Sequence, residues 1–246
     1  MSFLHSAAGL LSVLFLIAPL SAQVVEPVIV EHVQEVLQPQ QSEDWNLLLV
    51  NRWNPMPENY EVELKLLSQG VYVDARIYDD LRAMLAACRK DGLNPLVCSG
   101  YRSVETQTRL HNNKITRLLA EGYSQETAKE EARRWVAVPG TSEHHTGMAV
   151  DIVAVSYQKL TEQQEKTAEQ KWLMEHCWEY GFILRYPTEK SEVTGIGYEP
   201  WHYRYVGREA AMAMRDSGLC LEEYVRLLQA EESVLITEET AQETGS

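Results

Sequence analysis

The stretch from Ser142 to Asp151 reads SEHHTGMAVD and brings histidine, glycine and aspartate together. His144 precedes Asp151 by seven positions, and Asp151 lies between the apolar residues Val150 and Ile152. In a β-strand, successive side chains point to opposite faces. If this segment is a strand, Val150 and Ile152 enter the core and the Asp151 carboxylate faces a cleft.

A second stretch, residues 198–207, reads YEPWHYRYVG. Its aromatic residues alternate with other side chains, which predicts a strand with His202 on the face opposite the aromatics. One imidazole from each stretch and the Asp151 carboxylate make a His, Asp, His set. Three such ligands suit zinc and leave a fourth position for water, as in catalytic zinc sites. From ligand chemistry alone, His145 could replace His144.

These motifs occur in a fixed order along the chain. The pattern Ser-x-His-x-x-Gly-x-Ala-x-Asp at 142–151, followed by Glu-x-x-His at Glu199 and His202, resembles the VanY-type D-alanyl-D-alanine carboxypeptidases. Their wider fold group includes VanX dipeptidases, lysostaphin-type peptidases and the hedgehog signalling domain. The similarity covers about residues 48–228 and includes SGYRS at 99–103. The irregular interleaving of strands and helices predicts an α+β fold, an antiparallel sheet lined by helices, and the resemblance implies the same, with the zinc site on the sheet face.

The resemblance implies one zinc ion per chain, held by His144, Asp151 and His202. It selects His144 as the ligand and leaves His145 as a substrate-side or outer residue, or as an exposed one. Bound zinc lowers the pKa of its water toward ~7 and so makes the nucleophile for peptide hydrolysis.

Three further residues are candidates for the reaction. Glu199 would be the general base, and it can share a site with His202 only if the backbone turns at Pro200. The resemblance implies that Arg102 stabilises the oxyanion or grips the terminal carboxylate of the substrate. Ser142 either donates a hydroxyl to that carboxylate or caps the turn.

The resemblance also implies a substrate, the stem peptide of peptidoglycan, from which the enzyme removes the C-terminal D-alanine. The nearest alternative is an L,D-carboxypeptidase that acts on tetrapeptide stems. A zinc-dependent binding module without catalysis is a third hypothesis, and the presence of Glu199 favours the enzyme over it.

Composition and length set the domain organisation. The chain has 246 residues and a formal net charge of −14, which argues against nucleic acid as a partner. Residues 1–22 read as a signal peptide or membrane anchor, so an extracytoplasmic protein is expected, either secreted or held at the outer face of the cytoplasmic membrane. Membrane contact would occur only through that segment if it stays uncleaved. The other predicted segments are a tether at 23–44, a metallopeptidase domain at 45–230 and an acidic disordered tail at 231–246.

Local signals predict several elements. Asp74 should cap a helix that ends before Gly92, and further helices should begin near Ser103 and Ser124. The strand of the second histidine stretch is expected over residues 199–206.

Four other side chains carry expectations of their own. His176 should be a hydrogen-bonded core histidine and Arg204 half of a buried ion pair. Cys88 and Cys98 could form a disulfide or equally be two buried small hydrophobes.

Overall fold

The computed structural model describes residues 44–68 and 70–244. The predicted export segment at 1–22 and all but the last residue of the tether at 23–44 lie outside this range. In the part of the chain that is described, no helix is both long and apolar enough to cross a bilayer.

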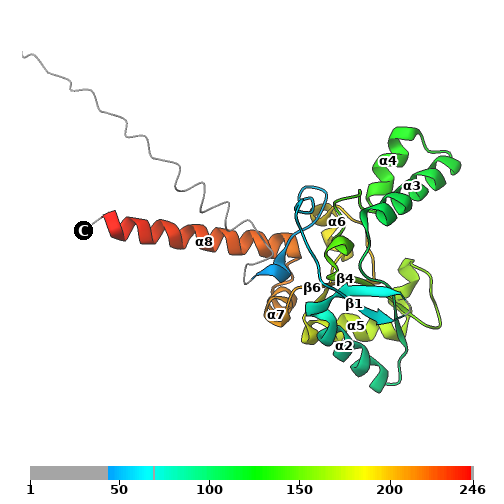
Figure 1. Ribbon diagram of the computed structural model, residues 1–246, viewed down its shortest axis with the longest axis horizontal. Coiled ribbons are helices and arrows are strands. Elements are labelled where there is room, and N and C mark those ends of the chain that lie inside the picture. Colours follow the sequence, from blue (N-terminus) through cyan, green and yellow to red (C-terminus); the bar gives the residue numbers. More distant parts are fainter. Residues whose placement is uncertain (1–43, 69, 245–246) are drawn as a thin grey trace, which may run out of the picture. The chain divides into compact units, whose positions relative to one another are not determined.

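The core of the fold is a four-stranded antiparallel sheet with the order β3-β4-β6-β5. Its two central strands, β4 and β6, are labelled in Figure 1. The strands are β3 (Pro95–Ser99), β4 (Ala149–Ala154), β6 (His202–Tyr205) and β5 (Phe182–Leu184). Every residue of β4 and of β6 is buried. A second, two-stranded sheet pairs β1 (Leu64–Ser68) with β2 (Val71–Asp74). The predicted α+β class is confirmed.

Helices and strands interleave irregularly along the chain. The α-helices are α2 (Tyr78–Lys90), α3 (Val104–Ala120), α4 (Gln125–Arg133), α5 (Ala168–His176), α6 (Ser191–Thr194), α7 (Arg208–Ser217) and α8 (Leu221–Thr244). Short 3-10 helices are η1 (Trp45–Leu47), η2 (Ala75–Ile77), η3 (Glu143–Thr146), η4 (Glu162–Lys166), η5 (Cys177–Tyr180) and η6 (Thr188–Lys190).

The main core lies between the sheet, α2 and α5. Val150, Ile152 and Tyr203 from the sheet pack with apolar residues of α2 such as Leu81 and with Leu173 of α5. Because Val150 and Ile152 occupy this core, Asp151 between them points to the other face. The alternation in the sequence therefore predicted the orientation of the carboxylate correctly.

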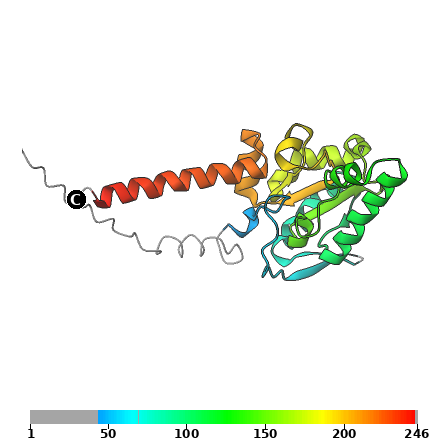
Figure 2. The ribbon, with the colours of Figure 1, turned by 90° about the horizontal axis from the view of Figure 1, so that it is seen from above.

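Helices α3 and α4 form a hairpin whose small apolar contact includes Leu118, Ala128 and Ala132 (Figures 1 and 2). Both helices begin where the capping signals predicted. Ser103 accepts a hydrogen bond from the Thr106 amide, and Ser124 caps α4 in the same way. The hairpin matters for function because α3 starts beside the candidate site.

Some elements differ from the expectations. Strand β6 begins only at His202, and residues 199–201 form the turn before it. Helix α8 continues through Glu231 to Thr244, where disorder was expected. Asp74 caps η2, which leads into α2.

Two predictions about single side chains also need correction. His176 is 35% exposed and binds Glu179 at the surface, so it is not a core histidine. Cys88 and Cys98 are both free thiols, Cys88 buried and Cys98 exposed, so there is no disulfide, and only Cys88 is a buried small hydrophobe.

Candidate metal centre and active-site cleft

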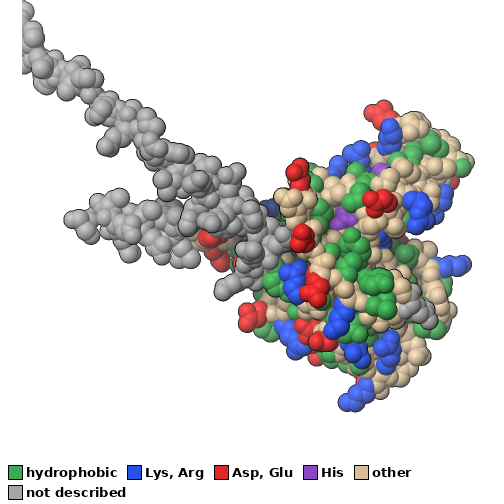
Figure 3. Space-filling model, in the orientation of Figure 1, with side chains coloured by type: hydrophobic (Ala, Val, Ile, Leu, Met, Phe, Trp, Pro, Cys, Tyr) green, Lys and Arg blue, Asp and Glu red, His purple; other side chains and the backbone are tan. Residues whose placement is uncertain are grey.

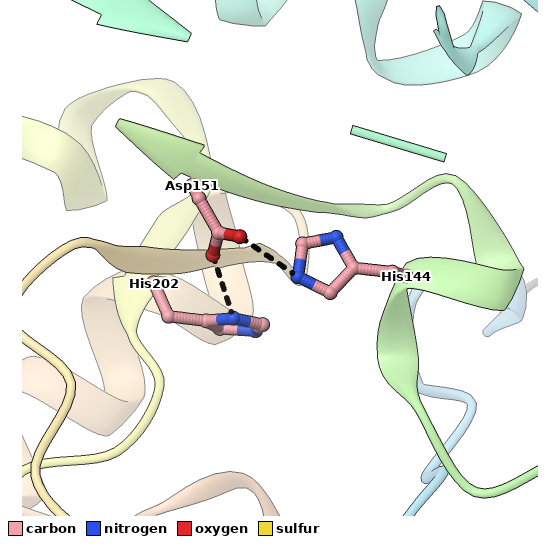
Figure 4. A group of neighbouring side chains, drawn as sticks. All are labelled: His144, Asp151 and His202. Atoms are coloured by element: carbon pink, nitrogen blue, oxygen red, sulfur yellow. Dashed lines mark hydrogen bonds and ion pairs between the residues drawn. The ribbon is translucent and has the colours of Figure 1, made fainter. Parts of the chain in front are cut away.

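Three side chains from separate elements converge at one point on the sheet (Figure 4). In the register of β4 and β6, Asp151 lies directly opposite His202. Helix η3 leads into β4 and supplies His144. One ligand atom from each of the three residues lies within 4.8 Å of the other two. The sequence predicted this set.

The turn between His144 and Asp151 depends on glycine. Gly147 has φ 72°, a conformation that residues with a side chain rarely adopt. A Cβ atom at Gly147 would lie 2.8 Å from the Asp74 amide nitrogen, which donates a hydrogen bond to the Gly147 carbonyl. The close approach of these backbones fixes where η3 ends and β4 begins.

The histidine rings present specific nitrogens to the centre. His144 Nδ1 bonds to the Gly100 carbonyl at 2.7 Å, which leaves His144 Nε2 facing Asp151 Oδ2 at 3.3 Å. His202 Nδ1 lies 3.2 Å from Asp151 Oδ1. A backbone carbonyl or carboxylate on the outer nitrogen is the usual way to orient a histidine that binds a metal.

His202 has such an outer partner in Glu143. Its Nε2 lies 3.5 Å from Glu143 Oε2, and neither of these buried atoms has a hydrogen-bond partner within the described residues. The other oxygen of Glu143 binds Arg185 at 2.8 Å and Arg204 at 2.9 Å. The predicted buried ion pair of Arg204 is confirmed. No pattern in the sequence indicates a role for Glu143, although it adjoins His144 in the motif.

The network continues to helix α8. Arg185 also binds both carboxylate oxygens of Glu222, at 2.8 and 2.6 Å, and Asn51 donates to the same carboxylate at 3.1 Å. Arg185 has no exposed surface. Glu222 belongs to the first turn of α8, so that helix is tied to the residue that orients His202.

The electrostatic field at the three residues favours a cation. Burial, with help from Arg102, lowers the pKa of His144 to about 4, so its ring is neutral. Burial alone would lower the pKa of His202, but the neighbouring carboxylates of Asp151 and Glu143 outweigh burial and raise the pKa to about 9. Burial alone would raise the pKa of Asp151, yet the histidines hold it well below its ordinary value. The carboxylates thus create a field that favours positive charge, and the N and O donors fit a divalent metal such as zinc.

Glu199 lies beside this centre in the turn that precedes β6. Its Oε2 is 3.7 Å from His202 Nδ1, and the His202 amide donates to the Glu199 carbonyl at 3.1 Å. The backbone therefore turns at Pro200, which brings Glu199 and His202 into one site as predicted. Burial raises the pKa of Glu199 to about 8.

Arg102 reaches the same centre from the loop between β3 and α3. Its guanidinium donates to Asp151 Oδ2 at 3.3 Å, to Ser99 Oγ at 2.9 Å and to Gln107 Oε1 at 2.8 Å. Ser142 is buried, lines a cavity that also contains Arg102 and the three converging side chains, and does not cap η3 with its side chain. The capping role is therefore wrong, and Ser142 stays a predicted substrate contact.

His145 has a structural position. Its Nδ1 binds the Arg102 carbonyl at 2.7 Å, and its Nε2 accepts from the Gly140 amide at 3.2 Å. The side chain is buried, so the exposed alternative is wrong. Because both ring nitrogens are engaged by backbone, His145 is not part of the metal set, and it holds the loop of Arg102 in place.

The centre opens into a cavity of about 710 Å³. Its walls come from α3, from the segment after α4 and from the loop before β6. Figure 3 shows histidine side chains at the surface between the α3–α4 hairpin and the rest of this face. His144, Asp151 and His202 all line this cavity, so a peptide that enters it meets the metal centre.

Residues 70–208 match the family model VanY, described as D-alanyl-D-alanine carboxypeptidase. The chain belongs to the VanY family. A relative of this VanY chain, the D-alanyl-D-alanine carboxypeptidase of Enterococcus faecalis, is 48% identical over 183 residues. The alignment covers 74% of this chain and 66% of the relative, so the chain spans just under two thirds of that protein.

Two solved VanY structures have the same fold. VanYB in complex with D-alanine-D-alanine matches with a TM-score of 0.69 and 48% identity, over 74% of this chain and 98% of that one. The vancomycin-resistance D,D-pentapeptidase VanY from a VanB-type cassette, in complex with Zn(II), matches with a TM-score of 0.68 at the same identity, over 74% and 99% of the two chains.

Proposed function

We propose that this protein is a zinc-dependent D-alanyl-D-alanine carboxypeptidase that removes the C-terminal D-alanine from peptidoglycan stem peptides. The convergence of His144, Asp151 and His202, with the Glu199 carboxylate 3.7 Å from one of the imidazoles, carries this proposal. Membership of the VanY family, with relatives in complex with Zn(II) and with D-alanine-D-alanine, supports it. A binding module without catalysis would not need the buried Glu199.

One zinc ion would be held by His144 Nε2, Asp151 and His202 Nδ1. When bound, zinc supplies a Lewis acid that polarises the scissile carbonyl and lowers the pKa of a water toward ~7. Glu143 would keep His202 in the tautomer that offers Nδ1, by accepting the proton on Nε2. The Gly100 carbonyl would accept the proton on His144 Nδ1 and so keep Nε2 available to the metal.

The chain's own residues would move the proton and hold the substrate. Glu199 takes the proton of the attacking water and later gives it to the leaving amine of D-alanine. Arg102, fixed by Ser99 and Gln107, either faces the developing oxyanion or binds the C-terminal carboxylate. Ser142 contributes a hydroxyl to that carboxylate.

Hydrolysis should require the metal. Zinc-loaded protein should release one D-alanine from an acyl-D-Ala-D-Ala peptide, and release should stop with a chelator and return when zinc is added. His144→Ala should bind no stoichiometric zinc and should not recover. Free D-alanine and protein-bound zinc are the measurements. A tetrapeptide stem incubated in parallel tests the L,D-carboxypeptidase alternative. Cleavage of the tetrapeptide alone would support that alternative and contradict the D-alanyl-D-alanine carboxypeptidase.

Arg102→Lys should lower kcat/KM by about 10²–10³-fold, because a lysine cannot reproduce the planar set of donors that the guanidinium offers. The expected loss includes the hydrogen bonds to Ser99 and Gln107 that fix the guanidinium. Steady-state kinetics on the acyl-D-Ala-D-Ala peptide measures it. Arg109→Lys on the exposed face of α3 is the control, and equal activity of both variants would remove Arg102 from the reaction.

The proposed substrate implies an extracytoplasmic place of action, and the N-terminal segment is proposed as the export signal or anchor. Residues 45–230 are proposed as the catalytic domain. Release of the protein into the medium as a shortened chain would support a cleaved signal.

A further inference from the structure

The cavity extends beyond the reaction centre along α3, because residues of this helix from Gln107 to Arg117 line it. Gln107 marks the metal end of this helix, because it binds Arg102 at 2.8 Å. With a rise of 1.5 Å per residue, Lys114 lies about 10 Å and Arg117 about 15 Å further along the helix. Both residues line the same cavity.

The far end of the cavity is cationic, although the whole chain has a net charge of −14. Lys114 is partly buried, with its Nζ 5.7 Å from the centroid of the Trp135 ring. Neither Lys114 nor Arg117 forms an ion pair with any residue that the structure describes. The carboxylates that line the cavity, Asp151 and Glu199, belong to the metal end. Two cations thus face the far end of the cavity without a negative partner.

This part of the wall is built of fixed groups. The Trp135 indole donates to Glu131 at 2.9 Å, and a Cβ atom at Gly197 would lie 2.9 Å from the Trp135 ring. Gln107 donates to the Ala137 carbonyl at 2.7 Å, which joins α3 to the segment after α4. These contacts fix the positions of Trp135 and of the α3 face that carries Lys114 and Arg117 relative to the metal end.

We infer that Lys114 and Arg117 bind a carboxylate on the peptide substrate, upstream of the scissile bond. An extended peptide spans about 3.3–3.6 Å per residue, so 10–15 Å corresponds to about three or four residues. Like charges three positions apart on a helix repel each other, and an anionic group between them relieves this repulsion. The site thus prefers peptides with an acidic residue at that distance. This inference rests on the proposed hydrolysis.

Two acetylated pentapeptides that end in D-Ala-D-Ala test the inference. They differ only at the third residue upstream of the scissile bond, which is glutamate in one and glutamine in the other. The wild-type protein should show a kcat/KM about three- to tenfold higher for the glutamate peptide, the size expected for partly exposed charge pairs. The ratio should decrease at high salt, since exposed charges are screened.

The double variant Lys114→Met, Arg117→Met should bring this ratio close to one, and Lys114→Glu, Arg117→Glu should favour the glutamine peptide. Both peptides are measured on the same protein, so a general loss of activity cancels from the ratio. Arg109→Met, an exposed cation of α3 outside the cavity, is the matched control and should keep the wild-type ratio.

The outcomes separate the two proposals. A wild-type ratio near one, with D-alanine released from both peptides, overturns the anionic subsite and leaves the carboxypeptidase intact. If neither peptide is cut, the proposed function fails. In that case, calorimetric binding of both peptides to zinc-loaded Glu199→Ala still tests the subsite: tighter binding of the glutamate peptide supports it, and equal binding overturns it.

Discussion

Glu199→Gln should retain one zinc ion per chain and lose about 10²–10⁴-fold in kcat, the range expected when a positioned general base is removed. The variant keeps the size of the side chain and removes only its ability to take a proton. Because Glu199 stands 3.7 Å from His202 Nδ1 and is not in the converging ligand set, the metal should stay bound. Zinc content by metal analysis and D-alanine release by steady-state kinetics are the two measurements.

The pH profile adds a second readout to this prediction. The base must be deprotonated, so activity should decrease as pH falls through the pKa of Glu199. Burial raises this pKa to about 8, and a bound cation lowers it. The acidic limb should be missing from the residual activity of Glu199→Gln. Glu189→Gln, at an exposed glutamate nearby, should behave as wild type, and full activity in Glu199→Gln would rule out Glu199 as the base.

Arg185→Met should lower the free energy of unfolding by about 3–5 kcal/mol, the usual cost of removing one partner from a buried ion pair. Glu222 would lose both bonds from the guanidinium and Glu143 would lose one, in a region without solvent. Zinc affinity should also weaken by about 10–100-fold, because Glu143 orients His202. Denaturant unfolding and chelator competition measure the two effects.

Two comparisons check this explanation. Arg185→Met combined with Glu222→Leu should recover part of the lost stability, since the stranded carboxylate is gone. Lys190→Met breaks an ion pair with Glu223 at the surface and should leave the unfolding midpoint almost unchanged. An unchanged midpoint for Arg185→Met as well would mean that water reaches these carboxylates.

The sequence predicted the parts of the site that local patterns specify. The alternation around Asp151 predicted which face of β4 carries the carboxylate, and Pro200 indicated the bend that Glu199 needs to share a site with His202. Ser103 and Ser124 gave the starts of α3 and α4, because an N-cap acts within one turn of helix. These signals depend on residues a few positions apart, which a single sequence displays directly.

Other features depend on contacts that one sequence does not display. Glu143 next to His144 reads as an ordinary surface carboxylate until Arg185 and Arg204 are brought to it by the sheet. The role of His145 was equally open, because its partners are backbone atoms of a distant loop. The tail after Glu231 lacks a core pattern, and yet α8 continues into it, since a helix can extend beyond its packed part.

The hydrogen bond between Asn51 and Glu222 joins positions 171 residues apart. The same Glu222 carboxylate binds Arg185, which in turn binds Glu143 beside His202. Residues 51–222 must therefore be synthesised before this network around the metal centre can form. Contacts between such distant positions slow folding. Because this network closes late, metal uptake by a nascent chain is disfavoured. A shortened protein that ends after β6 would lack Glu222 and therefore the carboxylate that binds Arg185.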